Sequence, residues 1–254
     1  MDISPHSLII IKVGTGTIIE EGKLHKTFLT ELVEEVNSLM VKGKRVVIVT
    51  SGAIGLGKAR LHFEKKETTL KEQQGLAAIG QIDLMMEYLK RFDAFGLEGA
   101  QVLLSQHDLL NHEYLANMRN AFEFLFENKV VPIVNENDVV ATEELRHNGA
   151  FSDNDMLSVL LAKQINATLL VLLTTKGGLV GKDGIITELK DFDELITLES
   201  KSKGGRGGIQ TKVEAIKSAN IAGIDVFVSG PESFQGFAHG KANGTIICAT
   251  KKTC

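Results

Sequence analysis

The chain has 254 residues, 43% hydrophobic and 24% charged, so it is long enough to bury a sizeable core as one large domain or two small ones. Its formal net charge of -4 and isoelectric point near 6.0 argue against a general nucleic-acid-binding protein, which usually carries a basic field. Cys248 and Cys254 have neither C-x-x-C spacing nor a neighbouring histidine cluster, so no structural zinc site or disulfide framework is indicated. We therefore expect small-molecule partners and a reducing, cytoplasmic setting.

The apolar start SLIIIKVGTG is interrupted by Lys12 and has no signal cleavage site after it, so we interpret it as a strand. Short apolar runs such as LLVLL at 169–173 fall well below the roughly 20 residues that cross a bilayer. We expect a soluble protein without membrane contact.

Short runs rich in aliphatic residues alternate with longer helical patterns. The predicted strands cover residues 8–13, 45–50, 100–105, 130–135, 168–173 and 225–229. Their apolar residues are continuous, which is typical of strands buried on both faces. Between strands, apolar residues recur at helical spacing over 32–40 and 109–126. This order predicts a three-layer α/β/α sandwich with a mainly parallel central sheet.

No repeat, low-complexity tract or long linker divides the sequence, so we expect one domain over residues 1–254. Within it, segment 139–152 reads as a hairpin with Asn148-Gly149 at its turn, an excursion suited to covering a ligand. Region 176–209 is rich in glycine and charge and is expected to be the most mobile part.

Glycine-rich turns follow two of the predicted strands, where open α/β sheets bind ligands. In KVGTG, Lys12 lies inside an apolar strand just before Gly14 and Gly16. A buried ammonium needs an anionic partner, although a lysine snorkelling from a strand end fits the same pattern. In TSGA (50–53), the amides at a helix start suit an anion, or the segment is simply a tight turn. It matches neither the Walker A nor the dinucleotide fingerprint.

Two further segments open helices. SKGGRGGIQTK carries glycines ahead of a helix with Lys212 in its first turns, which suits polyphosphate binding. In SDNDMLS, Ser152 is a natural N-cap and Asp155, three residues on, completes a variant of the capping box. The alternative is that this helix start lies in an active site. The combination and order of the turns carry more weight than any single one.

In this order the motifs KVGT, VIVTSGAI, AAIGQ, VPIVNENDVVAT, SDNDMLS and GRGGIQTK resemble the amino acid kinase family, and within it the glutamate 5-kinases. The likeness covers nearly the whole chain, and VPIVNENDVVAT followed closely by DND is its most specific part. The resemblance implies transfer of the γ-phosphoryl group of ATP, with Mg²⁺, to the side-chain carboxylate of L-glutamate. That reaction begins proline biosynthesis.

The resemblance also assigns site residues. Lys12 and Lys212 would flank the transferring phosphoryl group, and Asp155 would hold both lysines in position. Glutamate-binding roles fall on Ser51, Asp138, Asn154, Gly52 and Ala53, with Asp138 facing the α-ammonium group. Nucleotide-binding roles fall on Lys12, Gly14, Thr174, Thr175, Arg206, Gly207, Gly208 and Lys212. No metal ligands from the protein are implied. Capping and active-site readings are then compatible, because Ser152 and Asp153 can cap while Asn154 and Asp155 face the ligand.

Other residues of the NEND segment fit turn chemistry, with Asn137 at the rim of the site. On the nucleotide side the chain departs from the family pattern at Thr175, Val180, Arg206 and Ile209, so we expect different adenine and ribose contacts, and a phosphate contact from Arg206. A glutamate-binding lobe is expected over about 1–166 and a nucleotide-binding lobe over 167–254. Since the sequence stops soon after GTIICATKKTC, we expect a short form without the RNA-binding-like C-terminal domain seen in many glutamate 5-kinases.

Family analogy further implies feedback inhibition by proline and a homo-oligomer, a dimer or tetramer. The small residues of QQGLAAIGQ (73–81) would let another helix pack closely. Two alternatives remain. One is a kinase of the same fold for N-acetylglutamate, aspartate or uridine monophosphate, and the other is an amino-acid or nucleotide sensor without turnover. A sensor has no need for all of Lys12, Lys212 and Asp155, so their joint presence favours an enzyme.

Overall fold

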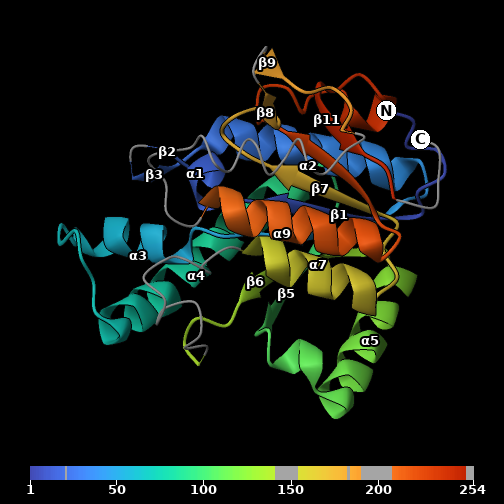
Figure 1. Cartoon of the computed structure of the whole chain (residues 1–254). Coiled ribbons are helices and arrows are strands. Elements are labelled where there is room, and N and C mark those ends of the chain that lie inside the picture. The colour runs from blue at the N-terminus through green and yellow to red at the C-terminus, as the bar shows by residue number, and fades with distance from the viewer. Residues whose placement is uncertain (21, 141–153, 182–183, 190–207, 250–254) are drawn as a thin grey trace.

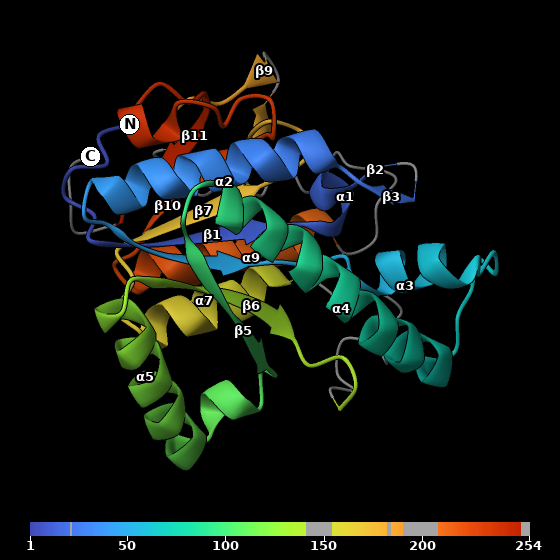
Figure 2. The same cartoon turned by 180° about the vertical axis from the view of Figure 1, so that it is seen from behind.

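A computed structural model describes residues 1–20, 22–140, 154–181, 184–189 and 208–249 of the chain (Figure 1). A seven-stranded sheet crosses its centre in the order β11-β10-β7-β1-β4-β6-β5. Neighbouring strands run parallel except β10 and β11 at one edge. Helices cover both faces of the sheet (Figures 1 and 2). The predicted three-layer α/β/α sandwich is confirmed.

The sheet strands are β1 (Leu8–Val13), β4 (Arg45–Val49), β5 (Glu98–Leu104), β6 (Val130–Glu136), β7 (Leu169–Leu173), β10 (Asp225–Ser229) and β11 (Gly244–Ile247). The helices are α1 (Thr15–Ile18), α2 (Lys26–Val41), α3 (Ala53–Leu61), α4 (Leu70–Ala94), η1 (Asp108–Leu110), α5 (His112–Glu127), α7 (Asn154–Gln164), α9 (Gly208–Ile221) and η2 (Phe237–His239). Two short antiparallel pairs join β2 (Ile19–Glu20) to β3 (Lys23–Leu24) and β8 (Val180–Gly181) to β9 (Gly184–Ile185). All the predicted strands are present, and the additional strands are those too short to show a pattern.

The two faces of the sheet bury separate cores because side chains alternate along each strand. In β1, Ile9, Ile11 and Val13 join the core formed with α2 and α4, which lie in front of the sheet in Figure 2. Leu8 and Ile10 join the opposite core, formed with α5, α7 and α9. Lys12 therefore has the same parity as the second set, and its side chain is directed toward α7 and α9.

Helix α4 packs closely against α3 through two glycines. A Cβ atom on Gly80 would lie 1.9 Å from the carbonyl oxygen of Ala53, and one on Gly57 would lie 2.0 Å from that of Leu76. The small-residue face of 73–81 is thus filled by a helix of the same chain. The expectation that another helix could pack closely on this face is met by α3, and helix periodicity alone did not reveal which helix it would be.

Parts of the prediction lie outside the described residues, namely Ser152, Asp153, most of the predicted hairpin and the segments 182–183 and 190–207. Cys248 is disulfide-bonded, whereas the cysteine pattern did not indicate a disulfide framework. Within the described ranges, no helix combines the length and apolar character that a bilayer crossing requires. The division into lobes stays a prediction, since one sheet spans both.

Candidate active site

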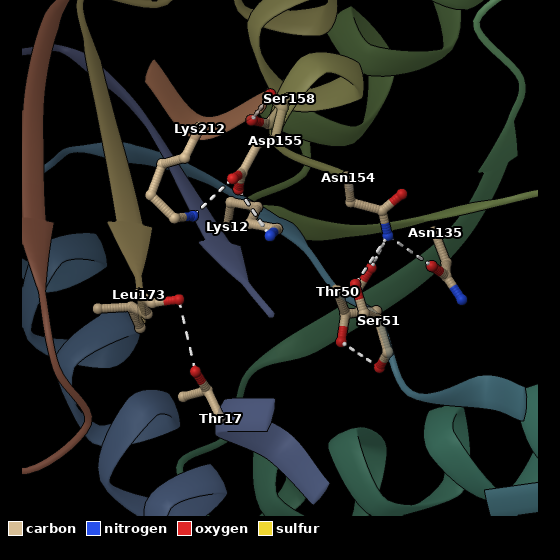
Figure 3. Close-up of polar contacts among 10 residues, drawn as sticks. All are labelled: Lys12, Thr17, Thr50, Ser51, Asn135, Asn154, Asp155, Ser158, Leu173 and Lys212. Carbon is tan, nitrogen blue, oxygen red and sulfur yellow. Dashed lines mark hydrogen bonds and ion pairs between the residues drawn. The ribbon is translucent and has the colours of Figure 1, made fainter. Parts of the chain in front are cut away.

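The carboxyl ends of β1, β4, β6 and β7 meet at one edge of the sheet, where the predicted turns come together (Figure 3). After β1, the hydroxyl of Thr17 donates to the carbonyl of Leu173 at the end of β7 (3.4 Å). After β4, the amide of Thr50 donates to the carbonyl of Val134 in β6 (2.8 Å). One bond ties the turn after β1 to the end of β7, and the other ties the end of β4 to β6, at the carboxyl ends of the strands where open α/β sheets bind ligands.

A buried carboxylate holds two lysines at this edge. Lys12 Nζ lies 2.6 Å from Asp155 Oδ1, and Lys212 Nζ lies 2.5 Å from Asp155 Oδ2. Figure 3 shows both lysine side chains directed toward Asp155 from different elements, β1 and α9. Asp155 is 0% exposed and Lys12 is 2% exposed, whereas Lys212 is 18% exposed. The structure brings the three predicted residues together, and Lys12 is buried rather than reaching out to solvent.

The charge balance of this trio makes it suited to binding an anion. Two ammonium groups share one carboxylate, which leaves one net positive charge in a site largely closed to water. Asp155 also lies in the first turn of α7, where the helix dipole favours a negative charge. A buried ion pair is tolerated only when its geometry is good and when hydrogen bonds satisfy the remaining lone pairs and protons of the two charged groups. Such a pair of ammonium groups is chemically able to bind an anion such as a phosphoryl group.

Next to the trio, the side-chain amide of Asn154 is held by three acceptors. Its Nδ2 donates to the carbonyl of Thr50 (2.5 Å), to Ser51 Oγ (2.9 Å) and to Asn135 Oδ1 (3.1 Å). Asn154 Oδ1 is buried and has no hydrogen-bond partner in the described part of the chain. A buried acceptor left unpaired costs about 1–3 kcal/mol, so this oxygen is available to accept a hydrogen bond from a ligand.

The TSGA turn supplies amides to the same region. Gly52 adopts φ 102°, and a Cβ atom there would lie 3.0 Å from Ile18 Cγ2, so the position requires glycine. Helix α3 begins at the next residue, Ala53, whose amide is one of those without an intrahelical acceptor. The turn thus places backbone amides at the start of a helix, as an anion-binding turn needs, and Ser51 contacts Asn154.

Asp138 follows β6 by two residues and is half-buried. Burial, reinforced by the neighbouring carboxylate of Glu136, raises the pKa of Asp138 from 3.8 to about 7. A carboxyl group in this state gains from a cation that restores its charge, which suits the predicted role toward an ammonium group.

On the nucleotide side, Gly14 lies beside Lys12, since a Cβ atom on Gly14 would be 3.5 Å from Lys12 Nζ. Thr174 follows β7 directly, and its hydroxyl oxygen accepts a hydrogen bond from the amide of Lys176 (3.1 Å). Thr175 is exposed and lies near Gly16. Gly208 opens α9, four residues before Lys212. Arg206 and Gly207 lie outside the described residues, so their predicted roles stay predictions.

Four polar residues around Asn154 were not expected from the sequence. Asn135 and Thr50 contact its amide, Gln81 accepts from Asn135 Nδ2 (2.8 Å), and Tyr88 shares a hydrogen bond with Thr50 Oγ1 (3.0 Å). Asn137 is the residue predicted for the rim of the site, whereas Asn135, two residues earlier, is the one that touches Asn154. Strand parity would have indicated this, because Asn135 shares a face of β6 with Val131 and Ile133, toward α4.

Residues 7–229 match the model of the amino acid kinase family. The chain belongs to the amino acid kinase family. Among curated members, the glutamate 5-kinase of Ligilactobacillus salivarius is 37% identical over 254 residues, covering 94% of this chain and 95% of that protein. The glutamate 5-kinase of Clostridium perfringens is 35% identical over 257 residues, covering 96% of each chain. The glutamate 5-kinase of Moorella thermoacetica is 39% identical and is covered to 66% of its length.

Solved structures of other proteins share the fold. Carbamate kinase from Giardia lamblia bound to AMP-PNP superposes with a TM-score of 0.65 at 13% identity, covering 96% of this chain and 99% of that one. N-acetylglutamate synthase from Neisseria gonorrhoeae superposes with a TM-score of 0.67 at 11% identity, covering 96% and 61%. At such identities the likeness extends to the architecture alone.

Proposed function

We propose that the protein transfers the γ-phosphoryl group of MgATP to the side-chain carboxylate of L-glutamate, giving L-glutamyl 5-phosphate and ADP. This reaction is the first step of proline biosynthesis. The observation that carries the proposal is the Lys12–Asp155–Lys212 trio at the carboxyl edge of the sheet. Relatives called glutamate 5-kinase, aligned over most of the chain, supply the acceptor.

The chemistry brings two anions together, so the protein has to neutralise charge and align the groups. The glutamate side chain is already ionised at neutral pH and attacks without a general base. Lys12 and Lys212 stabilise the charge that spreads over the transferring group, while Asp155 keeps their ammonium groups in fixed positions. Amides of Gly14, Gly52 and Ala53 serve the acceptor carboxylate and the phosphate. No covalent protein nucleophile takes part.

Magnesium enters with the nucleotide as part of the substrate MgATP. In the residues that the structure describes, no group of three or more His, Cys, Asp or Glu side chains is placed to hold a metal ion. Both oxygens of Asp155 are already occupied by lysines. The ion is therefore assigned to the phosphates of the substrate, with no ligand named from this chain.

Recognition of the acceptor favours an amino acid with a free amino group. Asp138 and the unpaired Asn154 Oδ1 are both acceptors, and an α-ammonium group brings the donors and the charge that they need. An N-acetylated amino group or a uridine monophosphate phosphate brings no such cation. This favours glutamate or aspartate over the other acceptors considered. The alignment with glutamate 5-kinases over most of the chain favours glutamate.

The first test measures ADP release by the purified protein with MgATP and, separately, L-glutamate, N-acetyl-L-glutamate, L-aspartate and uridine monophosphate. Hydroxylamine traps any acyl phosphate as a hydroxamate. We expect turnover and hydroxamate with glutamate alone. Turnover with another acceptor would overturn the glutamate assignment, and silence with every acceptor would favour a sensor.

In the same assay proline is expected to inhibit, because it offers an ammonium and a carboxylate but no side-chain acceptor.

We also place the enzyme in the cytoplasm as a homo-oligomer. Helix α4 exposes Ile82 (58%), Met86 (63%) and Leu89 (41%) at helical spacing, and β5 beside it is an open edge of the sheet. An exposed apolar stripe next to an edge strand favours association of two copies.

Light scattering is expected to give a multiple of the monomer mass for the wild type and a smaller mass for Met86→Glu. The control is Leu61→Glu, which places the same charge on the exposed end of α3 (Leu61 is 54% exposed) and leaves the mass unchanged. A monomeric wild type would contradict the proposal.

A further inference from the structure

Asn154 is the last member of a directed row of side-chain amides that begins at Gln101 on β5 and passes through Gln81 on α4. Gln81 Nε2 donates to Gln101 Oε1 (3.4 Å), Asn135 Nδ2 donates to Gln81 Oε1 (2.8 Å), and Asn154 Nδ2 donates to Asn135 Oδ1 (3.1 Å). Each amide gives its nitrogen to the oxygen of the preceding one. The row connects an exposed residue on β5 with the buried centre of the site.

The direction of the row is set at its inner end. An amide side chain can be turned over without changing its shape, so only its partners decide which end points where. The carbonyl of Thr50 accepts and cannot donate, and it lies 2.5 Å from Asn154 Nδ2. Nitrogen therefore faces the protein, and Asn154 Oδ1 is the end left buried and unpaired in the described chain.

Asn135 and Gln81 maintain this orientation of the Asn154 carboxamide. If Asn135 were turned over, its NH₂ group would meet the NH₂ group of Asn154, two donors with no acceptor between them. Gln81 Oε1 prevents this by accepting from Asn135 Nδ2. Asn135 is 2% exposed, so water cannot readily replace the missing partner.

We propose that Gln81 and Asn135 are positioning residues for substrate recognition, which hold the carboxamide of Asn154 so that its oxygen faces the amino group of the acceptor. Neither side chain has to touch the substrate. The inference rests on the proposed function in that the acceptor is taken to be an amino acid. It adds two residues, on α4 and β6, that determine which end of Asn154 the ligand meets.

The test compares steady-state kinetics of Gln81→Met with those of the wild type. Met keeps the helix and the volume but cannot accept a hydrogen bond. We expect the KM for glutamate to rise roughly three- to tenfold, as for the loss of one neutral hydrogen bond, with kcat and the KM for ATP unchanged. Gln81→Glu retains the accepting oxygen and is expected to restore a KM near that of the wild type.

Two comparisons separate positioning from general damage. Gln73→Met removes another glutamine of α4, whose Nε2 donates to the carbonyl of Thr68 (3.0 Å), and is expected to leave the KM for glutamate unchanged. In an Asn154→Ala background, Gln81→Met is expected to have no further effect on KM, because the group it positions is gone. If Gln81→Met does not fold, Gln81→Ala serves for the same comparisons.

An unchanged KM in Gln81→Met, a fall in kcat without a change in KM, or additive effects in the double variant would each overturn the inference. Failure of Gln81→Glu to restore KM would do so too. These outcomes test the inference only if the wild-type protein yields hydroxamate from glutamate. A wild type silent with glutamate would instead overturn the proposed function, so the two failures are distinguishable.

Discussion

Asp155→Ala is expected to lower kcat by roughly 100- to 1,000-fold, the range found when one charge-stabilising group of a transition state is removed. The carboxylate contacts Lys12 at 2.6 Å and Lys212 at 2.5 Å, so its loss affects both cations at once. Two ammonium groups would then face each other in a buried site without a compensating charge. Each would move away from its partner, and the transferring phosphoryl group would lose both. Initial-rate kinetics at saturating glutamate and MgATP measure the effect.

Asp155→Asn separates charge from shape, because it retains the size and an accepting oxygen but loses the negative charge. The kcat of Asp155→Asn is expected to be close to that of Asp155→Ala. The control is Asp83→Asn, which breaks the surface ion pair between Asp83 and Arg60 (2.6 Å) and is expected to leave kcat unchanged. Retained turnover in both Asp155→Ala and Lys12→Ala would remove the catalytic assignment of the trio.

The architecture was accessible from the sequence because buried parallel strands show continuous apolar runs. The runs at 8–13 and 225–229 coincide with β1 and β10 to the residue. Strand β11, with four residues at the antiparallel edge, has no such run and was missed. What single strands do not reveal is their neighbours in the sheet, since that order depends on contacts between distant segments.

The charged part of the site was accessible through the resemblance, whereas the polar support around it was not. Lys12 lies in an apolar strand and so required an anion, but its spacing from Asp155 carries no information about their contact. Asn135 and Gln81 each look unremarkable in a turn segment and in a helix. Their meaning depends on which helix covers which face of β6, and only the packed structure shows that α4 does.

Asp138→Asn is expected to raise the KM for glutamate roughly 10- to 100-fold, the effect of losing a hydrogen bond between charged groups. In the wild type the same KM is expected to fall as pH rises from about 6 to 8. Burial and Glu136 raise the pKa of Asp138 to about 7, so below that pH the carboxyl is mostly neutral and pairs poorly with an ammonium group. Glutamate keeps its own charges over this range, and kinetics at fixed ionic strength in the variant are expected to lose the pH dependence.

The pH dependence of stability gives an independent check on Asp138. As pH rises, ionisation of Asp138 is expected to strengthen glutamate binding but to lower the stability of the fold. A carboxyl group whose pKa is raised from 3.8 to about 7 by folding holds more protons in the folded than in the unfolded state between those values. Its contribution therefore makes the free energy of unfolding fall as pH rises from about 4 to 7. Asp138→Asn removes that cost and is expected to unfold at a higher temperature than the wild type at about pH 8, although it binds glutamate worse. A variant that lost both stability and affinity at that pH would show that Asp138 supports the fold, and the ammonium group would need another partner.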